Sequence, residues 1–161
     1  MFREMRRFKQ ALPKEEIVKV LENHMTGVLA VHGDDDYPYT IPLNYVYEDG
    51  KIYFHTALNG HKTDAIAKDD KVSFCVIDQD LNVSEKFTNY YRSVIAFGRA
   101  SVVTDDDEKR HALEIFTEKY SGDQPEENKK TAIERGYKVV LILRVDIEYM
   151  SGKQSMELIN R

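Results

Sequence analysis

Apolar side chains at alternate positions predict most of the strands in this chain. Residues 138–147 show the period most clearly, because Val139, Leu141, Leu143, Val145 and Ile147 occupy every second position. This spacing places apolar side chains on one face of an extended segment. Similar alternation, or short apolar runs bounded by turn residues, predicts five more strands. The six predicted strands cover residues 27–32, 37–47, 52–56, 71–77, 91–104 and 138–147.

Helical spacing of apolar residues predicts two clear helices and a third, short one. The first begins at Pro13, which is tolerated at the start of a helix, and its apolar face is Ile17, Val20 and Leu21. The short helix covers residues 63–68. The last follows the acidic, capping sequence of residues 104–108. Its apolar stripe consists of Ala112, Leu113, Phe116 and Tyr120.

The connections between these elements predict a barrel. Asp49-Gly50 is a strong hairpin signal between two predicted strands. Residues 78–90 and 121–136 are polar and are predicted to be surface loops. No Gly-x-Gly-x-x-Gly sequence lies between a strand and a helix, which excludes a Rossmann unit. We expect one mainly β domain over residues 1–161, a six-stranded antiparallel barrel with flanking helices.

Composition narrows the function classes. The chain has 161 residues, of which 42% are hydrophobic and 32% charged, an ordinary mix for a soluble domain. The net charge of −5 argues against a general nucleic-acid binder. We see neither an apolar run long enough for a bilayer nor a signal peptide, and the single Cys75 cannot form an internal disulfide. We expect a cytoplasmic protein that binds neither nucleic acid nor membrane.

Two charged segments add little to the prediction of function: one has two equal interpretations, and the other is a solvent-exposed turn. Residues 1–11 interleave cations with apolar side chains: Arg3, Arg6, Arg7 and Lys9 with Phe2, Met5 and Phe8. This pattern fits an arm that packs on another surface, such as a partner subunit, and equally a frayed terminus. The acidic turn Asp34-Asp35-Asp36 lacks the spacing of a calcium loop, so no metal site is predicted.

The stretch from Tyr53 to Lys62 is the strongest local candidate for a binding site. It begins as a strand, turns at Asn59-Gly60 and leads into a helix, with Thr56, His61 and Lys62 at the junction. Free N–H groups at a helix start, beside a lysine, can bind an anion such as phosphate. The alternative is that Gly60 is only a turn residue and Lys62 a solvated charge.

Pro42 marks the strand at residues 37–47 as exposed along one edge. A proline cannot donate a hydrogen bond to a neighbouring strand. An unpaired edge beside a phosphate site could hold a flat heterocycle through main-chain N–H and C=O groups. The predicted hairpin brings this edge close to the anion site. The alternative is a plain edge strand.

An ordered series of short motifs resembles a known family along nearly the whole chain. The matching residues are Met5-Arg6-Arg7, Gly27-Val28-Leu29-Ala30, Tyr37-Pro38-Tyr39, Pro42, Tyr45-Val46-Tyr47, Asp49-Gly50-Lys51-Ile52-Tyr53-Phe54-His55, Gly60-His61-Lys62, Val72-Ser73-Phe74-Cys75-Val76, Tyr91-Arg92-Ser93-Val94, Phe97-Gly98-Arg99-Ala100 and Met150-Ser151-Gly152-Lys153. The chain thereby resembles the flavin-binding split barrels related to pyridoxamine 5′-phosphate oxidase, and within them the nitroimidazole-resistance (Nim-like) branch.

The resemblance implies a homodimer that binds FMN, or alternatively FAD, between its subunits. Matching positions imply contacts with the flavin from His55, Thr56, Ala57, Gly60, His61 and Lys62, with Thr56 and Lys62 on the phosphate. The backbone of Ile41, Pro42, Leu43, Asn44 and Tyr45 would hold the ring system. Arg92 and Ser93 would reach the cofactor, often of the second subunit, and the tail around Lys153 would close the site. The chain has no Trp and lacks the C-terminal Arg and His of the oxidases, so pyridoxamine phosphate is not the expected substrate.

The activity implied by the resemblance is that of a flavin-dependent oxidoreductase, a reductase of nitro-aromatic (5-nitroimidazole-like) or similar small acceptors. His55 and His61 are the candidate catalytic residues, because histidine titrates near neutral pH and can supply a proton. His55 could instead only position Thr56, and His61 could instead contact the phosphate. A second hypothesis is a flavin- or haem-binding carrier or sensor without turnover, since fold does not fix function. A third is an interaction module with an empty pocket.

Overall fold

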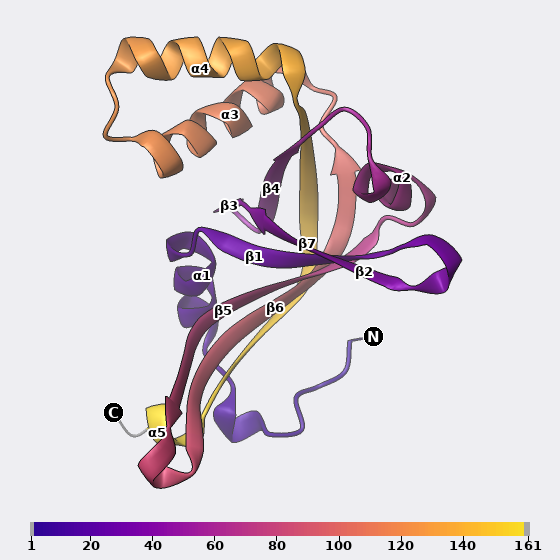
Figure 1. Cartoon of the computed structure of the whole chain (residues 1–161). Coiled ribbons are helices and arrows are strands. Elements are labelled where there is room, and N and C mark those ends of the chain that lie inside the picture. The colour runs from indigo at the N-terminus through magenta and orange to yellow at the C-terminus, as the bar shows by residue number, and fades with distance from the viewer. Residues whose placement is uncertain (1, 160–161) are drawn as a thin grey trace.

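The computed structural model describes residues 2–159 and shows a mainly antiparallel β protein with helices around the sheet (Figure 1). Seven strands form one sheet in the order β2-β1-β5-β6-β7-β4-β3, and every pair of neighbours is antiparallel. The strands are β1 Thr26–His32, β2 Pro38–Asn44, β3 Val46–Glu48, β4 Lys51–Thr56, β5 Lys71–Val83, β6 Thr88–Val102 and β7 Leu141–Gln154. The predicted fold class, a mainly β barrel with flanking helices, is confirmed.

The count of seven strands replaces the predicted six, because the second predicted strand is interrupted at Tyr45. That residue is fully buried, with its ring 4.8 Å from the ring of Phe74. Its backbone N–H and C=O bond to side chains rather than to a neighbouring strand. The pieces on either side, β2 and β3, form the two ends of the strand order. The sheet therefore closes through the peptide chain at Tyr45, with β2 and β4 unpaired to each other.

The barrel interior and α1 (Lys14–Asn23) share the main apolar core. Pro13 precedes α1 as its N-cap, and the predicted face of Ile17, Val20 and Leu21 is buried. The helix lies against β7, where a Cβ atom added to Gly152 would stand 2.8 Å from Ile17 Cγ1. Glycine at this position thus permits close helix–strand packing. The largest fully buried side chains of the core are Tyr45, Phe54, Phe74, Leu21, Leu29, Ile52 and Leu143.

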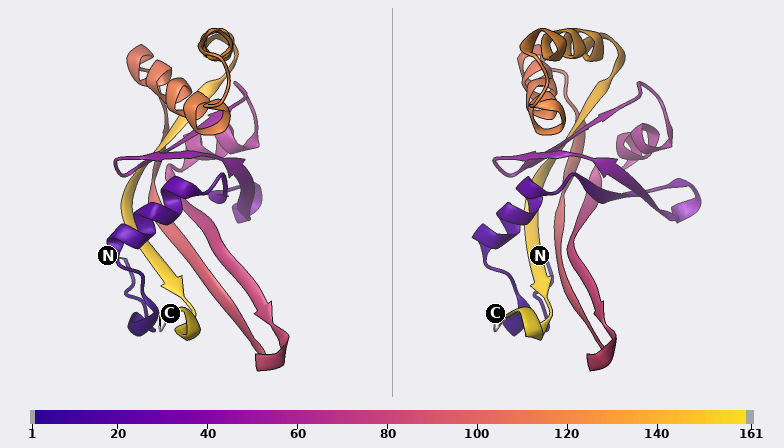
Figure 2. Two further views of the ribbon diagram at one scale, coloured as in Figure 1. Left: turned by 90° about the vertical axis from the view of Figure 1, so that its left-hand side faces the viewer. Right: turned by 60° about the vertical axis from the view of Figure 1, so that its left-hand side comes forward.

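Residues 78–90 are not the loop that their polarity predicts. Strands β5 and β6 continue through them as a two-stranded ribbon, which ends at the short 3₁₀ helix η3 (Ser84–Lys86). The ribbon projects from the barrel (Figure 2), so both of its faces meet solvent and polar residues are acceptable on either face. Within it, Asn89 Nδ2 donates to Asp80 Oδ1 at 2.5 Å.

Residues 121–136 also differ from the prediction, since they contain most of a helix rather than a surface excursion. Helix α3 (Asp106–Ser121) begins at the predicted acidic cap, where Asp105 Oδ1 accepts from the N–H of Glu108 at 2.8 Å. Helix α4 (Glu126–Val139) packs back on α3 at one end of the molecule, opposite the ribbon (Figure 2). Most of the α4 surface is charged, but one short side of the helix is apolar and packs on α3. A second core lies there: Val46, Tyr53, Val103, Ala112, Leu113, Phe116 and Ile142.

The remaining elements are short, and the predicted ends of some strands shift. Helix α2 spans His61–Lys68, α5 spans Met156–Ile159, and the 3₁₀ helices η1 and η2 cover Phe8–Gln10 and Asp34–Asp36. Strand β7 starts later than predicted and continues through the predicted tail. The ends of the predicted 1–161 domain and the first residue of the basic segment lie outside the described residues. Within residues 2–159, no helix has the length and apolar character needed to span a bilayer.

Candidate functional site

The start of α2 has the conformation expected of the turn at Asn59-Gly60. Gly60 has φ 154, a value at which an L side chain is strained even though the space around its Cα is open. The Thr63 hydroxyl donates to Gly60 O at 2.7 Å, and the N–H of Asp64 donates to the same oxygen. The first N–H groups of a helix have no acceptor within it. They are therefore available to a ligand at this end.

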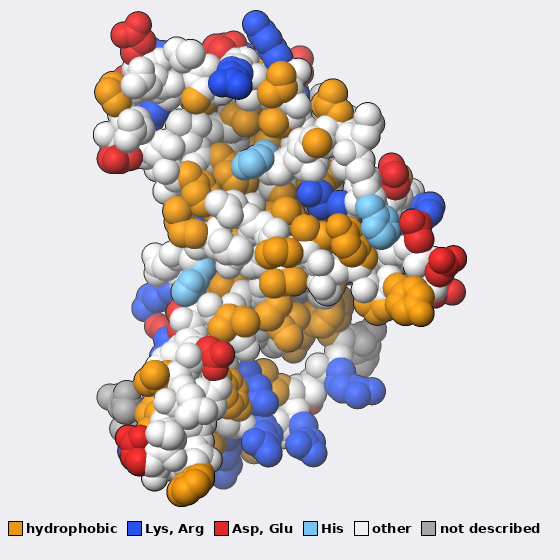
Figure 3. All heavy atoms as spheres, viewed as in Figure 1, with side chains coloured by type: hydrophobic (Ala, Val, Ile, Leu, Met, Phe, Trp, Pro, Cys, Tyr) orange, Lys and Arg blue, Asp and Glu red, His pale blue; other side chains and the backbone are white. Residues whose placement is uncertain are grey.

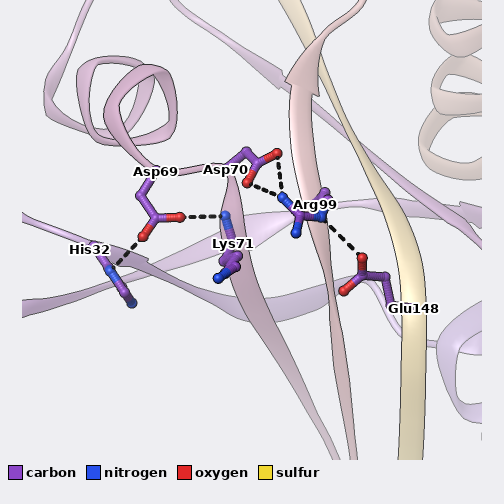
Figure 4. A network of polar contacts seen from close by, with 6 residues as sticks. All are labelled: His32, Asp69, Asp70, Lys71, Arg99 and Glu148. Carbon is purple, nitrogen blue, oxygen red and sulfur yellow. Dashed lines mark hydrogen bonds and ion pairs between the residues drawn. The ribbon is translucent and has the colours of Figure 1, made fainter. Parts of the chain in front are cut away.

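Polar contacts fix the other end of α2 to four strands, β1, β5, β6 and β7 (Figure 4). Asp69 Oδ2 lies 3.0 Å from His32 Nδ1 in β1, and Asp69 Oδ1 accepts from the N–H of Lys71. Arg99 in β6 donates to both carboxylate oxygens of Asp70, at 2.8 and 3.0 Å, and its Nε donates to Glu148 in β7. The helix is thus anchored at its C-terminal end.

Lys62 places an ammonium group at this helix start. Its side chain is partly buried, and burial lowers the pKa of the ammonium group. No ion pair or hydrogen bond engages it within residues 2–159. The nearby Lys68, by contrast, forms an ion pair with Asp34 at 3.1 Å. An unpaired, half-buried cation beside free N–H groups is favourable for an anion.

His61 is held against the turn between β1 and β2. Its ring stacks on Tyr39 with centroids 4.2 Å apart, and its Nε2 accepts from the N–H of Asp34 at 3.3 Å. The Asp34 carboxylate also lies 3.5 Å from Nε2. The ring thereby joins α2 to β2, and one of its nitrogens already has partners.

Strand β2 is an edge strand, as Pro42 predicts. It pairs only with β1, where Pro42 lies opposite Val28. Alternate side chains of the strand are partly buried against the core, while Pro42 and Asn44 are exposed. Its outer edge has no strand partner. The backbone of Tyr45 is different, because Tyr120 Oη accepts from its N–H at 3.0 Å and donates to its C=O at 2.8 Å.

His55 and Asn44 share a pocket of about 350 Å3 beneath the helical pair α3–α4. The His55 ring meets Phe116 edge-on, with centroids 5.1 Å apart. Burial lowers the pKa of His55, and the charge of Lys62 lowers it further, so the imidazole is neutral at neutral pH. The other pocket residues are mostly apolar: Leu113, Phe116, Thr117, Tyr120, Ser121, Ala132, Ile133, Gly136 and Val140. The ends of β2 and β4 therefore meet at one pocket.

Thr56 and Ala57 lie between His55 and the helix start. Thr56 ends β4 opposite Leu141 of β7 and is partly buried, while Ala57 is exposed in the following turn. No side-chain hydrogen bond engages the Thr56 hydroxyl within residues 2–159. Among the same residues, no group of three or more His, Cys, Asp or Glu side chains could hold a metal ion.

Arg92, Ser93 and Lys153 lie at the other end of the sheet. Arg92 pairs with Gln154 and Ser93 with Lys153, near the C-terminal end of β7, whereas Thr56 pairs at its beginning. At a rise of about 3.3 Å per residue, those ends are roughly 40 Å apart along the strand. The Nε of Arg92 is buried without a hydrogen bond in the described chain, and Asp78 Oδ2 lies 3.4 Å from it. One subunit does not bring these residues to Lys62.

Sequence reasoning missed Lys119 and Tyr120 as supports of the β2 edge. Lys119 Nζ donates to His24 O at 2.7 Å and to Tyr45 O at 3.2 Å. The hydroxyl of Tyr120 reaches Met25 O as well as the Tyr45 backbone. Together they fix the end of α3 to the strand break. The sequence offers no signal for this role, since a Lys-Tyr pair ending an amphipathic helix is common.

Comparison with known proteins shows which family and which solved structures this chain is similar to. The model of the family described as pyridoxamine 5′-phosphate oxidase matches residues 13–154. A candidate 5-nitroimidazole antibiotic resistance protein from Bacteroides thetaiotaomicron has a TM-score of 0.75 at 22% identity, over 89% of this chain and 86% of that one. A FAD-binding protein from Mesorhizobium loti has a TM-score of 0.67 at 24% identity, over 90% and 96%. A FAD- and haem-binding protein from Mycobacterium smegmatis has a TM-score of 0.72 at 19% identity, over 91% and 74%. No curated protein matches the sequence.

Proposed function

Because this chain belongs to the pyridoxamine 5′-phosphate oxidase family, whose model matches residues 13–154, we propose that it is a flavoprotein that uses FMN or FAD for an oxidoreductase reaction. The observation that carries this proposal is the unpaired Lys62 at the start of α2, next to the open edge of β2. A cation and free N–H groups suit the flavin phosphate, and an open strand edge suits the polar rim of its ring system.

The residues of this region fit the groups of a flavin. Lys62, Thr56 and the first N–H groups of α2 would bind the phosphate, with His61 holding α2 against β2. The edge from Ile41 to Asn44 would bind the ring, while the Tyr45 backbone is already occupied by Tyr120 and Lys119. A bound flavin supplies the electron transfer, and the protein supplies position and a sheltered pocket. The neutral His55 could accept a proton at the pocket wall and release it readily, because its pKa is lowered.

We also propose a homodimer whose flavin sites lie between subunits. Lys62 and the residues Arg92 and Lys153 lie toward opposite ends of the same sheet. They could meet at one cofactor only if two copies pack in opposite directions. A two-fold axis relating two chains produces this arrangement twice.

The proposed acceptor is a small planar molecule of the nitro-aromatic class. The pocket beside His55 has about 350 Å3 and an aromatic wall at Phe116, which suits one ring system. The description of the Bacteroides thetaiotaomicron neighbour as a candidate 5-nitroimidazole resistance protein supports this class. Anaerobic turnover of a 5-nitroimidazole by the reduced protein tests it directly.

The first test is an absorbance spectrum of the purified protein before and after addition of FMN or FAD. We expect flavin bands that co-elute with the protein. Lys62→Ala should weaken flavin binding at least about tenfold, since it removes a charge-assisted contact with the phosphate. Lys68→Ala is the matched control, because Lys68 is the lysine already paired with Asp34. A protein that binds neither flavin, or equal loss in both variants, would contradict the assignment.

A carrier or sensor without turnover is the second candidate function. The Mycobacterium smegmatis neighbour, described as binding FAD and haem, favours it, as does a histidine in an apolar pocket, which is a common setting for haem. A Soret band on addition of haem, abolished by His55→Ala, would support haem binding. Reduction of acceptors by the flavin-loaded protein would support the oxidoreductase.

A further inference from the structure

A cavity of about 360 Å3 lies under the N-terminal arm, at the end of the molecule that also carries α5 (Figure 1). Here the arm means residues 2–12. The cavity is lined by Arg6, Arg7, Phe8, Lys9, Gln10 and Met156. None of these residues belongs to the region around Lys62.

The arm is fixed against the sheet rather than frayed. The N–H of Leu12 donates to Gly152 O at 2.9 Å, and Ala11 forms an isolated bridge with Lys153. Near its start, the ring of Phe2 stacks on Tyr149 at 5.0 Å. The shape of the cavity is therefore set by contacts at both ends of the arm.

The cations around the cavity have no counter-ions among the described residues. Arg6, Arg7 and Lys9 are exposed and form no ion pair within residues 2–159. Glu157 of α5 bonds to Thr88 instead. Figure 3 shows Lys and Arg side chains gathered at this end of the molecule. In a chain with a net charge of −5, such a local excess of positive charge favours an anionic ligand.

Two buried polar side chains at this end of the molecule, Gln10 of the arm and Ser155, each have one polar atom without a partner in the described chain. Gln10 is 4% exposed, and its Nε2 donates to Tyr91 Oη at 3.3 Å while its Oε1 has no partner. Exchanging the amide N and O leaves the other atom unpaired, so the conclusion does not depend on the assignment. Ser155, next to Met156, is 3% exposed with an unpaired hydroxyl. Buried polar groups ordinarily have a partner.

We propose that this cavity binds a nucleotide phosphate, with the phosphate between Arg6, Arg7 and Lys9. Gln10 would bond to a polar group of the sugar or base. Phe8, with 72% of its surface exposed, offers an aromatic face on which the base can stack. A simple phosphate would leave this face and much of the volume unused. Two ligands contain such a nucleotide. One is FAD, through its adenylate half, and the other is a separate dinucleotide that donates electrons.

Calorimetric titration of the FMN-loaded protein with AMP tests the proposal, because FMN has no adenylate half that could fill the cavity. Arg6→Ala with Arg7→Ala should weaken AMP binding by about tenfold or more, because two charge-assisted contacts are lost. Arg135→Ala with Lys138→Ala, two exposed α4 cations without ion pairs in the described chain, is the control of equal charge change. Phe8→Ala should weaken AMP binding but leave the binding of inorganic phosphate unchanged.

Competition identifies the source of the nucleotide. Displacement of AMP by FAD but not by FMN or NADPH identifies the adenylate half of FAD, and displacement by NADPH identifies a dinucleotide donor. Absence of AMP binding at millimolar concentration, or AMP binding that is equal in the parent and the Arg6–Arg7 double variant, overturns the proposal. The proposed flavin site is judged separately, since Lys62→Ala does not touch this cavity.

Discussion

His55 lies between an aromatic ring and an ammonium group. Phe116 meets its ring edge-on at 5.1 Å, and Lys62 is close enough for its charge to act on the imidazole. Burial first, and then Lys62, lower the pKa of His55. Both effects disfavour the imidazolium form. The folded protein therefore takes up this proton less readily than the unfolded chain does.

This difference predicts a loss of stability on acidification. Between the lowered pKa of His55 and its ordinary value of about 6.5, the unfolded chain binds more protons, so stability rises with pH. We expect the unfolding temperature of flavin-free protein to fall as the pH drops below about 6.5, and His55→Gln to reduce that fall. Melting curves from neutral to mildly acidic pH measure it.

His111→Gln is the control for this experiment. The His111 ring lies 2.6 Å from a Glu48 oxygen on the surface, so this variant removes a histidine from a different, exposed environment. An acid-side fall that is the same in His55→Gln as in the parent would refute the role given to His55.

At the scale of elements, α3 acts on β2 through two side chains at its C-terminal end. Tyr120 Oη contacts the N–H and C=O of Tyr45 and the C=O of Met25, and Lys119 contacts the C=O of His24 and Tyr45. These bonds replace the strand pairing that β2 and β3 lack at their junction. The helix thereby sets the direction of the edge proposed to hold the flavin ring.

Tyr120→Phe should destabilise the protein by about 1–3 kcal/mol, because it leaves the buried backbone N–H of Tyr45 without an acceptor. It should also weaken flavin binding. Tyr137→Phe is the matched control, since the hydroxyl of Tyr137 bonds to Asp106 at an exposed site. Urea unfolding compares the two variants. Similar losses in both would show that Tyr120 does not support the strand break.

Local patterns in the sequence predicted elements whose neighbours are close along the chain. The Asp49-Gly50 hairpin, the Asp105 cap and the edge character of Pro42 are of this kind. The sequence pattern gave the wrong structure where contacts between residues far apart in the chain determine it. Tyr45 interrupts its strand because residues 119 and 120 bind its backbone, and residues 126–139 form a helix whose apolar side packs on α3 and the second core.

The candidate site was predicted only in part for the same reason. The junction at Gly60 and the position of Lys62 follow from adjacent residues. The stacking of His61 on Tyr39 and the pocket shared by Asn44 and His55 depend on the closure of the barrel. A sequence pattern contains no information on which residues meet there.

At the scale of the whole molecule, the separation of Lys62 from Arg92 makes the proposed dimer testable by complementation. Lys62→Ala and Arg92→Ala chains are co-expressed with different tags, and the mixed dimer is purified. If each flavin site takes Lys62 from one chain and Arg92 from the other, one site of the mixed dimer is intact and the other carries both changes. We expect half the flavin content of the parent, with little in either single-variant dimer.

The two single-variant dimers are the controls for this experiment. If Lys62 and Arg92 of the same chain served one flavin, both sites of the mixed dimer would carry one change, and its flavin content would not rise above theirs. That result would remove the shared site, although it would leave the flavin assignment of Lys62 in place.

Because the barrel closes through the peptide chain at Tyr45, it can open locally between β2 and β4. Because β2 and β4 are not paired, they can separate without breaking any hydrogen bond between strands. Such a motion must break the side-chain contacts at Tyr45 and the contacts of α2 with Tyr39 and Asp34, and it must turn the backbone at Tyr45. Local openings of this kind require less free energy than global unfolding. A large planar molecule could therefore enter and leave between these strands while amide protons deep in β5, β6 and β7 stay protected from exchange.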